Sequence, residues 1–230
     1  MIIPAHNEQD SLEKVIAEVK SNGQDLDVLV VDDASTDGTK KVAQQSGVAI
    51  ATLPFNLGIG GAVQTGFKVA RTLGYEVAIQ VDGDGQHDPS CIQELIGPLV
   101  QNEADIAIGS RHLHNGKSNP SLTRALGIRF FSWMTSRAIS QEVTDCSSGF
   151  RALNRKAFSL FADEYPVDFP DAEALIAAHR AGLRIREVGV KFRDRAHGKS
   201  SLRLWRMLYY PFKETFSIVM MMTKGSRPIE

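Results

Sequence analysis

The chain has 230 residues, of which 43% are hydrophobic and 23% are charged, with 26 Lys and Arg against 27 Asp and Glu. This mixture is typical of a soluble globular protein and excludes a disordered, collagen-like or fibrous chain. The net charge of -1 gives no reason to expect a nucleic-acid partner. Two cysteines are too few for a disulfide framework, and Met1 leads straight into Ile2-Ile3-Pro4, so we expect a reducing compartment and no signal peptide.

The charges are unevenly distributed along the chain. Between Lys191 and Arg227, nine basic residues stand against two acidic ones, so this segment carries +7 and the remainder carries -8. Such a split predicts a C-terminal segment that meets something anionic.

The first half of the chain alternates short apolar runs with helical patterns. Strands are predicted at residues 1–3, 27–33, 48–53, 76–82 and 105–109. Helices are predicted at residues 12–19, 61–73 and 89–100. Because only three residues precede Pro4, the first strand is expected to be abbreviated or to begin upstream. The alternation predicts an α/β fold, a mostly parallel sheet flanked by helices.

The second half is less regular. Helices are predicted over residues 122–139 and 171–181, a short strand over 148–153, and an alternating strand over 183–192. Internal repeats, low-complexity tracts and linkers are absent from the sequence. We therefore expect one domain over residues 1–200, followed by a C-terminal helical segment.

Two of the predicted strands end in acidic residues. Asp32 and Asp33 close the second strand, and the fourth runs into the segment DGDGQHD at residues 82–88. In open α/β sheets, ligands bind at the carboxyl ends of the strands. Both acidic segments are therefore candidates for a ligand site.

The segment after residue 82 has the spacing of a site with oxygen ligands. In an extended chain, residues i and i+2 point the same way, so Asp82, Asp84 and Gln86 are expected to face one point. Oxygen ligands suit Mg²⁺ or Mn²⁺, and Gly83 and Gly85 let a bulky ligand approach the backbone. Acids this close repel one another unless a cation neutralises them, although a solvated acidic turn is the alternative interpretation.

The segment after Asp33 is typical of a turn followed by a helix cap. Ser35 and Asp37 are therefore expected to be structural. Asp33 itself either belongs to this turn or hydrogen-bonds the edge of a base or a ribose, and the spacing leaves both open.

Other nucleotide-binding motifs do not match. The segment GIGGAV at residues 58–63 has Val63 where a dinucleotide-binding loop needs its last Gly. The segment ending in Gly198-Lys199-Ser200 has Arg193 where a P-loop needs its first Gly. A dehydrogenase and a nucleoside triphosphatase are therefore both disfavoured.

Several segments together resemble a known family. Residues 3–8 (IPAHNE), 30–39 (VVDDASTDGT) and 82–87 (DGDGQH) resemble family 2 glycosyltransferases of the GT-A fold. Residues 145–151 (DCSSGFR) and 195–200 (RAHGKS) resemble the dolichol- or polyprenyl-phosphate glycosyltransferase branch. The resemblance extends to about residue 205 and implies a GT-A (Rossmann-like) catalytic domain over residues 1–200.

The resemblance also implies roles for individual residues. Asp82 and Asp84 would be an Asp-x-Asp pair which, with Gln86, holds Mg²⁺ or Mn²⁺ on the diphosphate of a UDP- or GDP-sugar. The residues implied to line the nucleotide-sugar pocket are Pro4, His6, Glu8, Val31, Asp33, Gly83, Arg111 and Lys199. The residues implied to act in catalysis are Asp82, Asp84, Asp171, Glu173 and Arg195.

Three of these roles concern the sugar and the phosphates. Asp171 and Glu173 fall where such enzymes carry acids near the sugar. Arg111 would face the donor or a lipid phosphate, and Arg195 would clamp phosphate from a mobile loop. The chain departs from the family pattern Gly-x-Ser-Lys, because residue 201 is Ser, and Lys199 would supply the charge instead.

The implied reaction is an inverting, metal-dependent transfer of a sugar to polyprenyl or dolichyl phosphate. A lipid phosphate is already an anion and needs little deprotonation, whereas a hydroxyl acceptor needs a general base. Cations must then surround two anions, and the candidates are Arg111, Arg124, Arg129 and Arg151, with surface or membrane contact favoured for Arg124 and Arg129. The alternatives are a saccharide hydroxyl acceptor in cell-envelope polysaccharide synthesis and a catalytically silent nucleotide-sugar binding module.

The C-terminal segment, residues 201–230, is expected to be an amphipathic helix. Apolar residues at helical spacing are mixed with basic ones, and Pro211 would kink it. It is too often interrupted by charge to span a membrane, so it either packs on its own domain or lies on a membrane surface. We expect a cytoplasmic enzyme, peripheral at the inner face of the membrane, with a separate membrane-protein partner.

Overall fold

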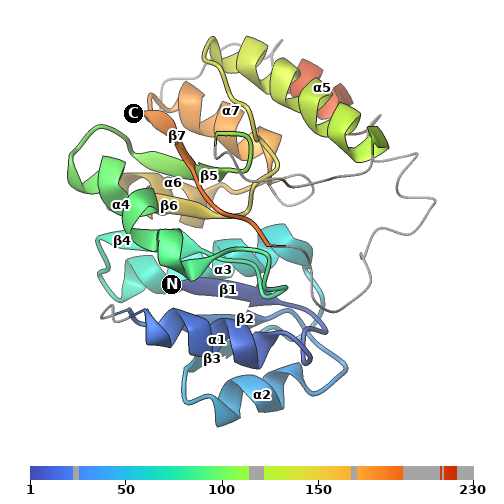
Figure 1. Ribbon diagram of the computed structural model, residues 1–230, viewed down its shortest axis with the longest axis vertical. Helices are drawn as coiled ribbons and strands as arrows, with labels where there is room; N and C mark the ends of the chain where they lie inside the picture. The colour runs from blue at the N-terminus through green and yellow to red at the C-terminus, as the bar shows by residue number, and fades with distance from the viewer. Residues whose placement is uncertain (23–25, 114–121, 167–169, 194–212, 214, 222–230) are drawn as a thin grey trace.

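The computed structural model describes residues 1–22, 26–113, 122–166, 170–193, 213 and 215–221. Within them the chain forms a seven-stranded sheet in the order β3-β2-β1-β4-β6-β5-β7 (Figure 1). The strands are β1 (Ile2–Ala5), β2 (Leu29–Asp32), β3 (Ala49–Thr52), β4 (Val77–Gln80), β5 (Ile106–Ser110), β6 (Arg151–Asn154) and β7 (Ile185–Gly189). All pairings are parallel except those of β6, which runs against both its neighbours, β4 and β5. The predicted α/β fold is confirmed.

Helices cover both faces of this sheet. They are α1 (Leu12–Ser21), α2 (Thr39–Gln45), α3 (Gly58–Thr72), α4 (Ile92–Val100), α5 (Leu122–Ile139), α6 (Arg155–Asp163) and α7 (Ala172–Arg180). On one face, Ile3 of β1 belongs to a core cluster with α1 and α4. On the other face, Phe67 of α3 and Phe158 of α6 belong to a second cluster that extends to α7. Each half of the core therefore lies between the sheet and one helical layer.

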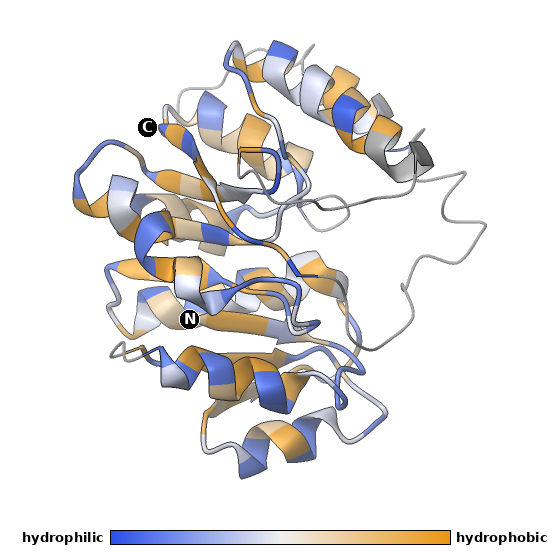
Figure 2. Ribbon diagram, viewed as in Figure 1, coloured by the Kyte–Doolittle hydropathy of each residue, from blue (hydrophilic) through white to orange (hydrophobic). Residues whose placement is uncertain are grey.

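Two helices show how the sequence pattern forms local structure. The periodicity predicted for residues 12–19 is confirmed in α1, which buries Leu12, Val15, Ile16 and Val19. Figure 2 shows the resulting alternation of hydrophobic and hydrophilic residues along this helix. Helix α3 begins at Gly58, three residues before its predicted start at Gly61. This early start is explained by a carboxylate, described below, that accepts hydrogen bonds from the first N–H groups of the helix.

The first strand runs through Pro4, which corrects the prediction that it stops at residue 3. In a strand between two parallel neighbours, the backbone N–H and C=O groups of successive residues point alternately towards one neighbouring strand and the other. Ile2 accepts a hydrogen bond from Val81, so Ile2 and Pro4 face β4, whereas Ala5 accepts one from Asp33 after β2. The pairing of β1 with β4 is confined to Ile2 and Gln80. The missing N–H of Pro4 therefore costs no ladder hydrogen bond.

The region around β6 differs most from expectation. The strand predicted at residues 148–153 is displaced to Arg151–Asn154, and the helix α6 was not predicted. Asn154 ends β6 and caps α6 at once, because its side-chain oxygen accepts the N–H of Ala157 at 3.0 Å. A strand joined to a helix through one cap residue leaves no loop signal in the sequence.

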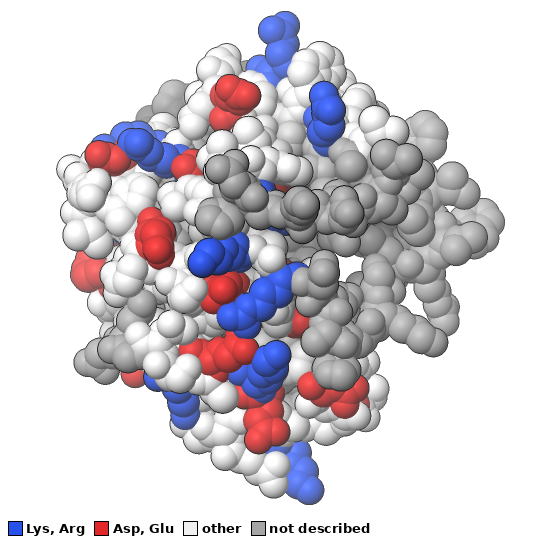
Figure 3. All heavy atoms as spheres, viewed as in Figure 1, with Lys and Arg blue, Asp and Glu red and all other residues white. Residues whose placement is uncertain are grey.

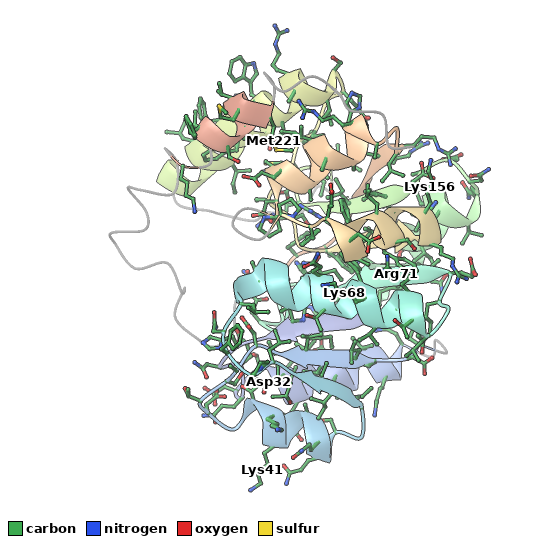
Figure 4. The ribbon with its side chains drawn as sticks, turned by 180° about the vertical axis from the view of Figure 1, so that it is seen from behind. Asp32, Lys41, Lys68, Arg71, Lys156 and Met221 are labelled. Carbon is green, nitrogen blue, oxygen red and sulfur yellow. The ribbon has the colours of Figure 1, made fainter. Side chains whose placement is uncertain are left out.

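The C-terminal segment lies mostly outside the described residues. Residues 213 and 215–221 are helical, with Ile218 buried in the same core cluster as Met134 of α5. Figures 1 and 4 place this helix beside α5, with Met221 labelled there. Over the described residues of the face drawn in Figure 3, acidic and basic side chains are interspersed rather than gathered by sign.

No helix among the described residues is both long enough and apolar enough to cross a membrane.

Candidate active site

The carboxyl ends of β1, β2 and β4 lie next to one another at one edge of the sheet. Asp32, labelled in Figure 4, is the last residue of β2 and is buried. Its Oδ1 accepts the N–H of Ser35 at 3.1 Å and so forms the predicted turn. Asp37 accepts the N–H of Thr39 at 2.9 Å, which is a structural role, as expected.

Asp33 joins the end of β2 to the start of α3. Its carboxylate oxygens accept the N–H groups of Leu57 at 2.7 Å and Gly58 at 2.9 Å, where a negative charge also stabilises the positive end of the helix. Its carbonyl oxygen lies 2.7 Å from Nδ1 of His6. The structure thus brings His6 and Asp33 together. The Asp33 carboxylate serves the protein's own backbone, and its contact with a base or ribose stays a prediction.

The backbone at Gly83 passes closely against the loop after β1. A Cβ at Gly83 would lie 3.4 Å from the carbonyl oxygen of Pro4 and 3.6 Å from Cγ of Glu8. Ser11 Oγ lies 2.7 Å from the Gly83 oxygen and 2.9 Å from Oε2 of Glu8. Pro4, Glu8 and Gly83 therefore lie close together, with Pro4 and Gly83 themselves buried and Glu8 partly exposed. Val31 is fully buried in the core.

The acidic loop after β4 is a turn rather than an extended segment. Gly85 has a φ of 76°, and Oδ1 of Asp84 accepts the N–H of Gln86 at 3.0 Å. The argument that made residues 82, 84 and 86 face one point therefore does not apply here, because it holds only for extended backbone. Asp84 is buried, whereas the Asp82 side chain is 34% exposed.

The Asp82 carboxylate lies between His87 and Gly149. Oδ2 is 3.7 Å from Nε2 of His87. A Cβ at Gly149 would be only 2.7 Å from each Asp82 oxygen, so a larger residue would displace the carboxylate. The segment at residues 145–151, noticed in the sequence for its resemblance alone, thus forms one wall of this site.

Arg111 is held by a buried partner. Its Nε and Nη2 donate to the Asp145 carboxylate at 2.7 and 2.9 Å, and Nη2 also donates to Ser147 at 2.9 Å. The guanidinium carbon lies 4.8 Å from the centre of the Phe192 ring. Asp145 is fully buried, and despite this burial the hydrogen bonds and charge of Arg111 lower its pKa. The pair therefore remains ionised and rigid.

Arg151 is not the free cation that the sequence predicted. It is almost completely buried and donates to the backbone carbonyls of Cys146, Ser148, Pro170 and Asp171 at 2.8 to 3.1 Å. A guanidinium whose donors all point at carbonyls holds a loop in place. Arg151 therefore shapes the wall of the site instead of meeting a substrate phosphate.

Asp171 lies at the start of α7, at the edge of this region. One carboxylate oxygen is 3.9 Å from Arg151, and 47% of the side chain is exposed to water. Desolvation by the surrounding protein raises its pKa to about 6, with smaller contributions from Arg151, which opposes the shift, and from Asp82 and Asp145, which add to it. The charge of Arg111 also acts on Asp171 and opposes the rise of its pKa. Glu173 is partly buried in the first turn of α7.

Some predicted residues cannot be placed. Arg195 and Lys199 lie outside the described residues, as does the side chain of Arg124. Sequence reasoning also missed contributors, namely His87, Asp145 and Gly149. Each belongs to a motif quoted for its resemblance, so a signal was present without a physical reason attached to it.

The described acids suit a divalent cation that takes some of its ligands from a substrate. No three or more His, Cys, Asp or Glu side chains gather as a metal site within the described residues. The carboxylates of Asp82 and Asp84 nevertheless offer the oxygen donors that Mg²⁺ and Mn²⁺ prefer, and the absence of a side chain at Gly149 accommodates the Asp82 carboxylate. Such cations are often held by one or two carboxylates together with substrate phosphates.

The comparisons with known proteins agree with this geometry. The family model described as glycosyl transferase family 2 matches residues 1–161. The UDP-N-acetylglucosamine–dolichyl-phosphate N-acetylglucosaminyltransferase of Methanococcus voltae is 31% identical over 212 residues, covering 83% of this chain and 84% of that protein. The undecaprenyl-phosphate mannosyltransferase of Micrococcus luteus is 32% identical over 214 residues, covering 87% and 86%.

The fold has close counterparts among solved structures. Glucosyl-3-phosphoglycerate synthase from Mycobacterium tuberculosis, in complex with phosphoglyceric acid, matches with a TM-score of 0.74 at 18% identity, covering 100% of this chain and 86% of that chain. The sheet and its acidic carboxyl edge thus define a glycosyltransferase with the predicted GT-A fold. The chain belongs to glycosyl transferase family 2.

Proposed function

We propose that this enzyme transfers a sugar from a nucleotide diphosphate sugar to polyprenyl or dolichyl phosphate, with inversion at the sugar carbon. The observation that supports this acceptor most strongly is the match to lipid-phosphate glycosyltransferases, which extends over more than 80% of both chains. A saccharide hydroxyl acceptor is the second candidate, because the pKa of about 6 at Asp171 suits a general base.

The donor binds at the carboxyl edge of β1, β2 and β4. Asp82 and Asp84, with Gln86, hold Mg²⁺ or Mn²⁺ against its diphosphate. When bound, the cation stabilises the negative charge that develops on the departing nucleoside diphosphate. Support comes from a synthase structure of the same fold, 20% identical to this chain, that is described with Mn²⁺ and uridine-diphosphate-glucose.

The acceptor phosphate approaches the sugar from the side opposite the leaving diphosphate. Because it is already an anion, it needs cations more than it needs a base. Arg111, fixed by Asp145, supplies a positive charge that does not have to be reorganised during the reaction. Arg195 and Lys199 place positive charge next to the leaving phosphates. Asp171 and Glu173 orient the sugar through its hydroxyl groups.

The enzyme reaches its lipid acceptor by lying on the cytoplasmic face of an anionic membrane. Helix α5 exposes Leu126, Phe130 and Trp133, which lie at i, i+4 and i+7 on one face. The helix carries three Arg residues and no acid. The neighbouring C-terminal helix exposes Phe216, Val219 and Met220. Apolar residues that enter the interface, joined by basic residues that attract the leaflet, are typical of such peripheral contact.

The deciding experiment is a panel of UDP- and GDP-sugars with undecaprenyl phosphate, in Mg²⁺ or Mn²⁺ and in chelator, read by mass spectrometry. We expect a product that partitions into organic solvent, is labile to mild acid, has inverted stereochemistry and disappears with chelator. Asp84→Asn should retain the fold and lose at least about 100-fold in kcat. A water-soluble product would favour the hydroxyl acceptor, and full turnover in chelator would reject the metal.

A further inference from the structure

His87 is enclosed on both faces and at its edges. The side chain is fully buried. Its ring stacks on Phe150 with centres 5.0 Å apart and an angle of 12° between the planes. It meets the Phe192 ring edge-on at 5.1 Å and 88°, and the Arg111 guanidinium lies over that same Phe192 ring. These contacts fix the plane of the imidazole, and the hydrogen bond from Asp82 to Nδ1 fixes the positions of its two nitrogens.

That orientation determines what each ring nitrogen does. The backbone N–H of Asp82 donates to Nδ1 of His87 at 3.1 Å, so Nδ1 is an acceptor and carries no proton. In a neutral ring the proton is then on Nε2. Nε2 lies 3.7 Å from Oδ2 of Asp82, so the N–H is on the side of the carboxylate. One side chain therefore contacts both the backbone and the carboxylate of Asp82.

We propose that His87 is a positioning residue that sets the direction in which the Asp82 carboxylate meets the cation and diphosphate of the donor. The inference rests on the proposed function for the metal role of Asp82. His87 limits the carboxylate on one side and Gly149 leaves it no more than a narrow slot on the other. Groups that orient metal ligands in this way are commonly worth 10- to 100-fold in metal affinity or activity.

The arrangement also connects the two charged parts of the site. From Phe150, the rings of His87 and Phe192 lead to Arg111, which is fixed by Asp145. The position of Asp82, just after β4, is therefore tied by packing to the position of Arg111, just after β5. A substitution at His87 should therefore affect cation binding at Asp82 more than it affects the stability of the fold.

The test compares Mn²⁺ binding, by electron paramagnetic resonance in the presence of UDP or GDP, among three variants of the full chain. His87→Phe keeps the stacked ring and removes both nitrogens. His87→Gln places an amide N–H near the position of Nε2. His179→Phe, at an exposed position in the last turn of α7, is the matched control.

We expect His87→Phe to weaken Mn²⁺ binding about 10- to 100-fold and to raise the donor KM. His87→Gln should recover at least part of this loss, and His179→Phe should bind as the wild type does. Wild-type Mn²⁺ affinity in His87→Phe would overturn the inference. Failure of the wild-type protein to bind Mn²⁺ with either nucleotide would instead reject the metal in the proposed function, so the two failures are distinguishable.

A second measurement needs no variant at all. In protein labelled with ¹⁵N-histidine, the structure predicts that His87 is protonated at Nε2 and not at Nδ1. Adding Mg²⁺ with the nucleotide should shift the Nε2 resonance, because the neighbouring Asp82 carboxylate then shares its charge with the cation. A proton on Nδ1, or an Nε2 resonance that Mg²⁺ and nucleotide leave unchanged while binding occurs, would overturn the inference even if His87→Phe does not fold.

Discussion

Asp171 and Arg151 are neighbours with opposite fates. Arg151 is almost completely buried, and its guanidinium donates to four backbone carbonyls. Asp171 is only 3.9 Å away but has nearly half of its side chain in water, which leaves it accessible to a substrate. The sequence distinguishes neither, because burial depends on how the loop at residues 145–151 folds over Arg151.

Asp171 gives a prediction about pH. Its pKa of about 6 is above the ordinary value of 3.8, so the carboxyl loses its proton between pH 5 and 7 in the folded enzyme. If ionised Asp171 orients the sugar, kcat should fall about tenfold from pH 7 to pH 5. Asp171→Asn should lower kcat and flatten this profile. An acid limb that persists unchanged in Asp171→Asn would contradict the assignment.

Stability should change in the opposite direction. A carboxyl whose folded pKa is raised binds its proton more tightly in the folded state, so its contribution to stability falls as pH rises from 3.8 through about 6. Asp171→Asn should therefore be at least as stable as the wild type at pH 7. Burial lowers the pKa of His87 below its ordinary value, because the charged imidazolium loses its hydration there.

At the scale of elements, α5 is apolar on two sides. Its inner side buries Met134, Thr135 and Ile139, whereas its outer side exposes Phe130 and Trp133. A helix in a soluble protein normally carries polar residues on its outer face. The exposed apolar residues of α5 are consistent with the membrane contact proposed above.

The double variant Phe130→Ser with Trp133→Ser tests this face. We expect it to reduce cosedimentation with vesicles of anionic lipid by at least about fivefold, because most of the apolar contact is removed. The matched control is Leu73→Ser with Val100→Ser, which removes exposed apolar residues at the ends of α3 and α4. Equal cosedimentation of both double variants and the wild type would exclude α5 as the membrane contact.

Elements were predictable where their signals were local. The α1 stripe and the 18-residue span of α5 could be read from periodicity and apolar composition, and their bounds match closely. Helix α6 was missed because Asn154 joins it directly to β6 without a loop. The end of β1 was placed too early. Pro4 is tolerated in this strand because β4 does not pair with it there, and that pairing depends on residues far away in the sequence.

At the scale of the whole molecule, Asp105 pins the start of β5 to the two strands beside it. Its carboxylate accepts the N–H of Arg184, just before β7, at 2.8 Å, and the amide of Asn154, at the end of β6, at 2.8 Å. Although burial opposes it, this network lowers the pKa of Asp105 to about 2. Its contribution to stability is present above pH 3.8 and is lost as the pH falls towards 2.

Asp105→Ala should therefore lower the free energy of unfolding at pH 7 by about 1 kcal/mol, since it leaves partly buried donors without their acceptor. The measurement is urea unfolding from pH 7 down to pH 2.5, over which the difference from the wild type should shrink. Asp163→Ala removes an exposed partner of Arg71 and should have a much smaller effect. Equal midpoints for Asp105→Ala and the wild type at pH 7 would show that the network is not stabilising.

The site was partly predictable at this scale. Strand ends in an open α/β sheet meet at one edge, so general rules indicated residues 82–84 as a candidate ligand site, whereas their proposed metal role came from the family resemblance. These rules did not predict the opposite wall of the site. Strand β6 is antiparallel to β4, so Gly149, which precedes β6, lies at the same edge as the end of β4. The presence of this wall was indicated only by the family resemblance of residues 145–151.

Because β6 runs antiparallel, residues from early and late in the chain form different parts of the candidate site. The residues proposed to hold the cation and the nucleoside come from before residue 90, whereas the loop entering β6 and the helices around it come after residue 120. Natural variation in the later part can therefore exchange one receiving molecule for another while the earlier part keeps the same sugar carrier. Chimeras joined between β5 and α5 should inherit the choice of nucleotide from their first half and the choice of acceptor from their second.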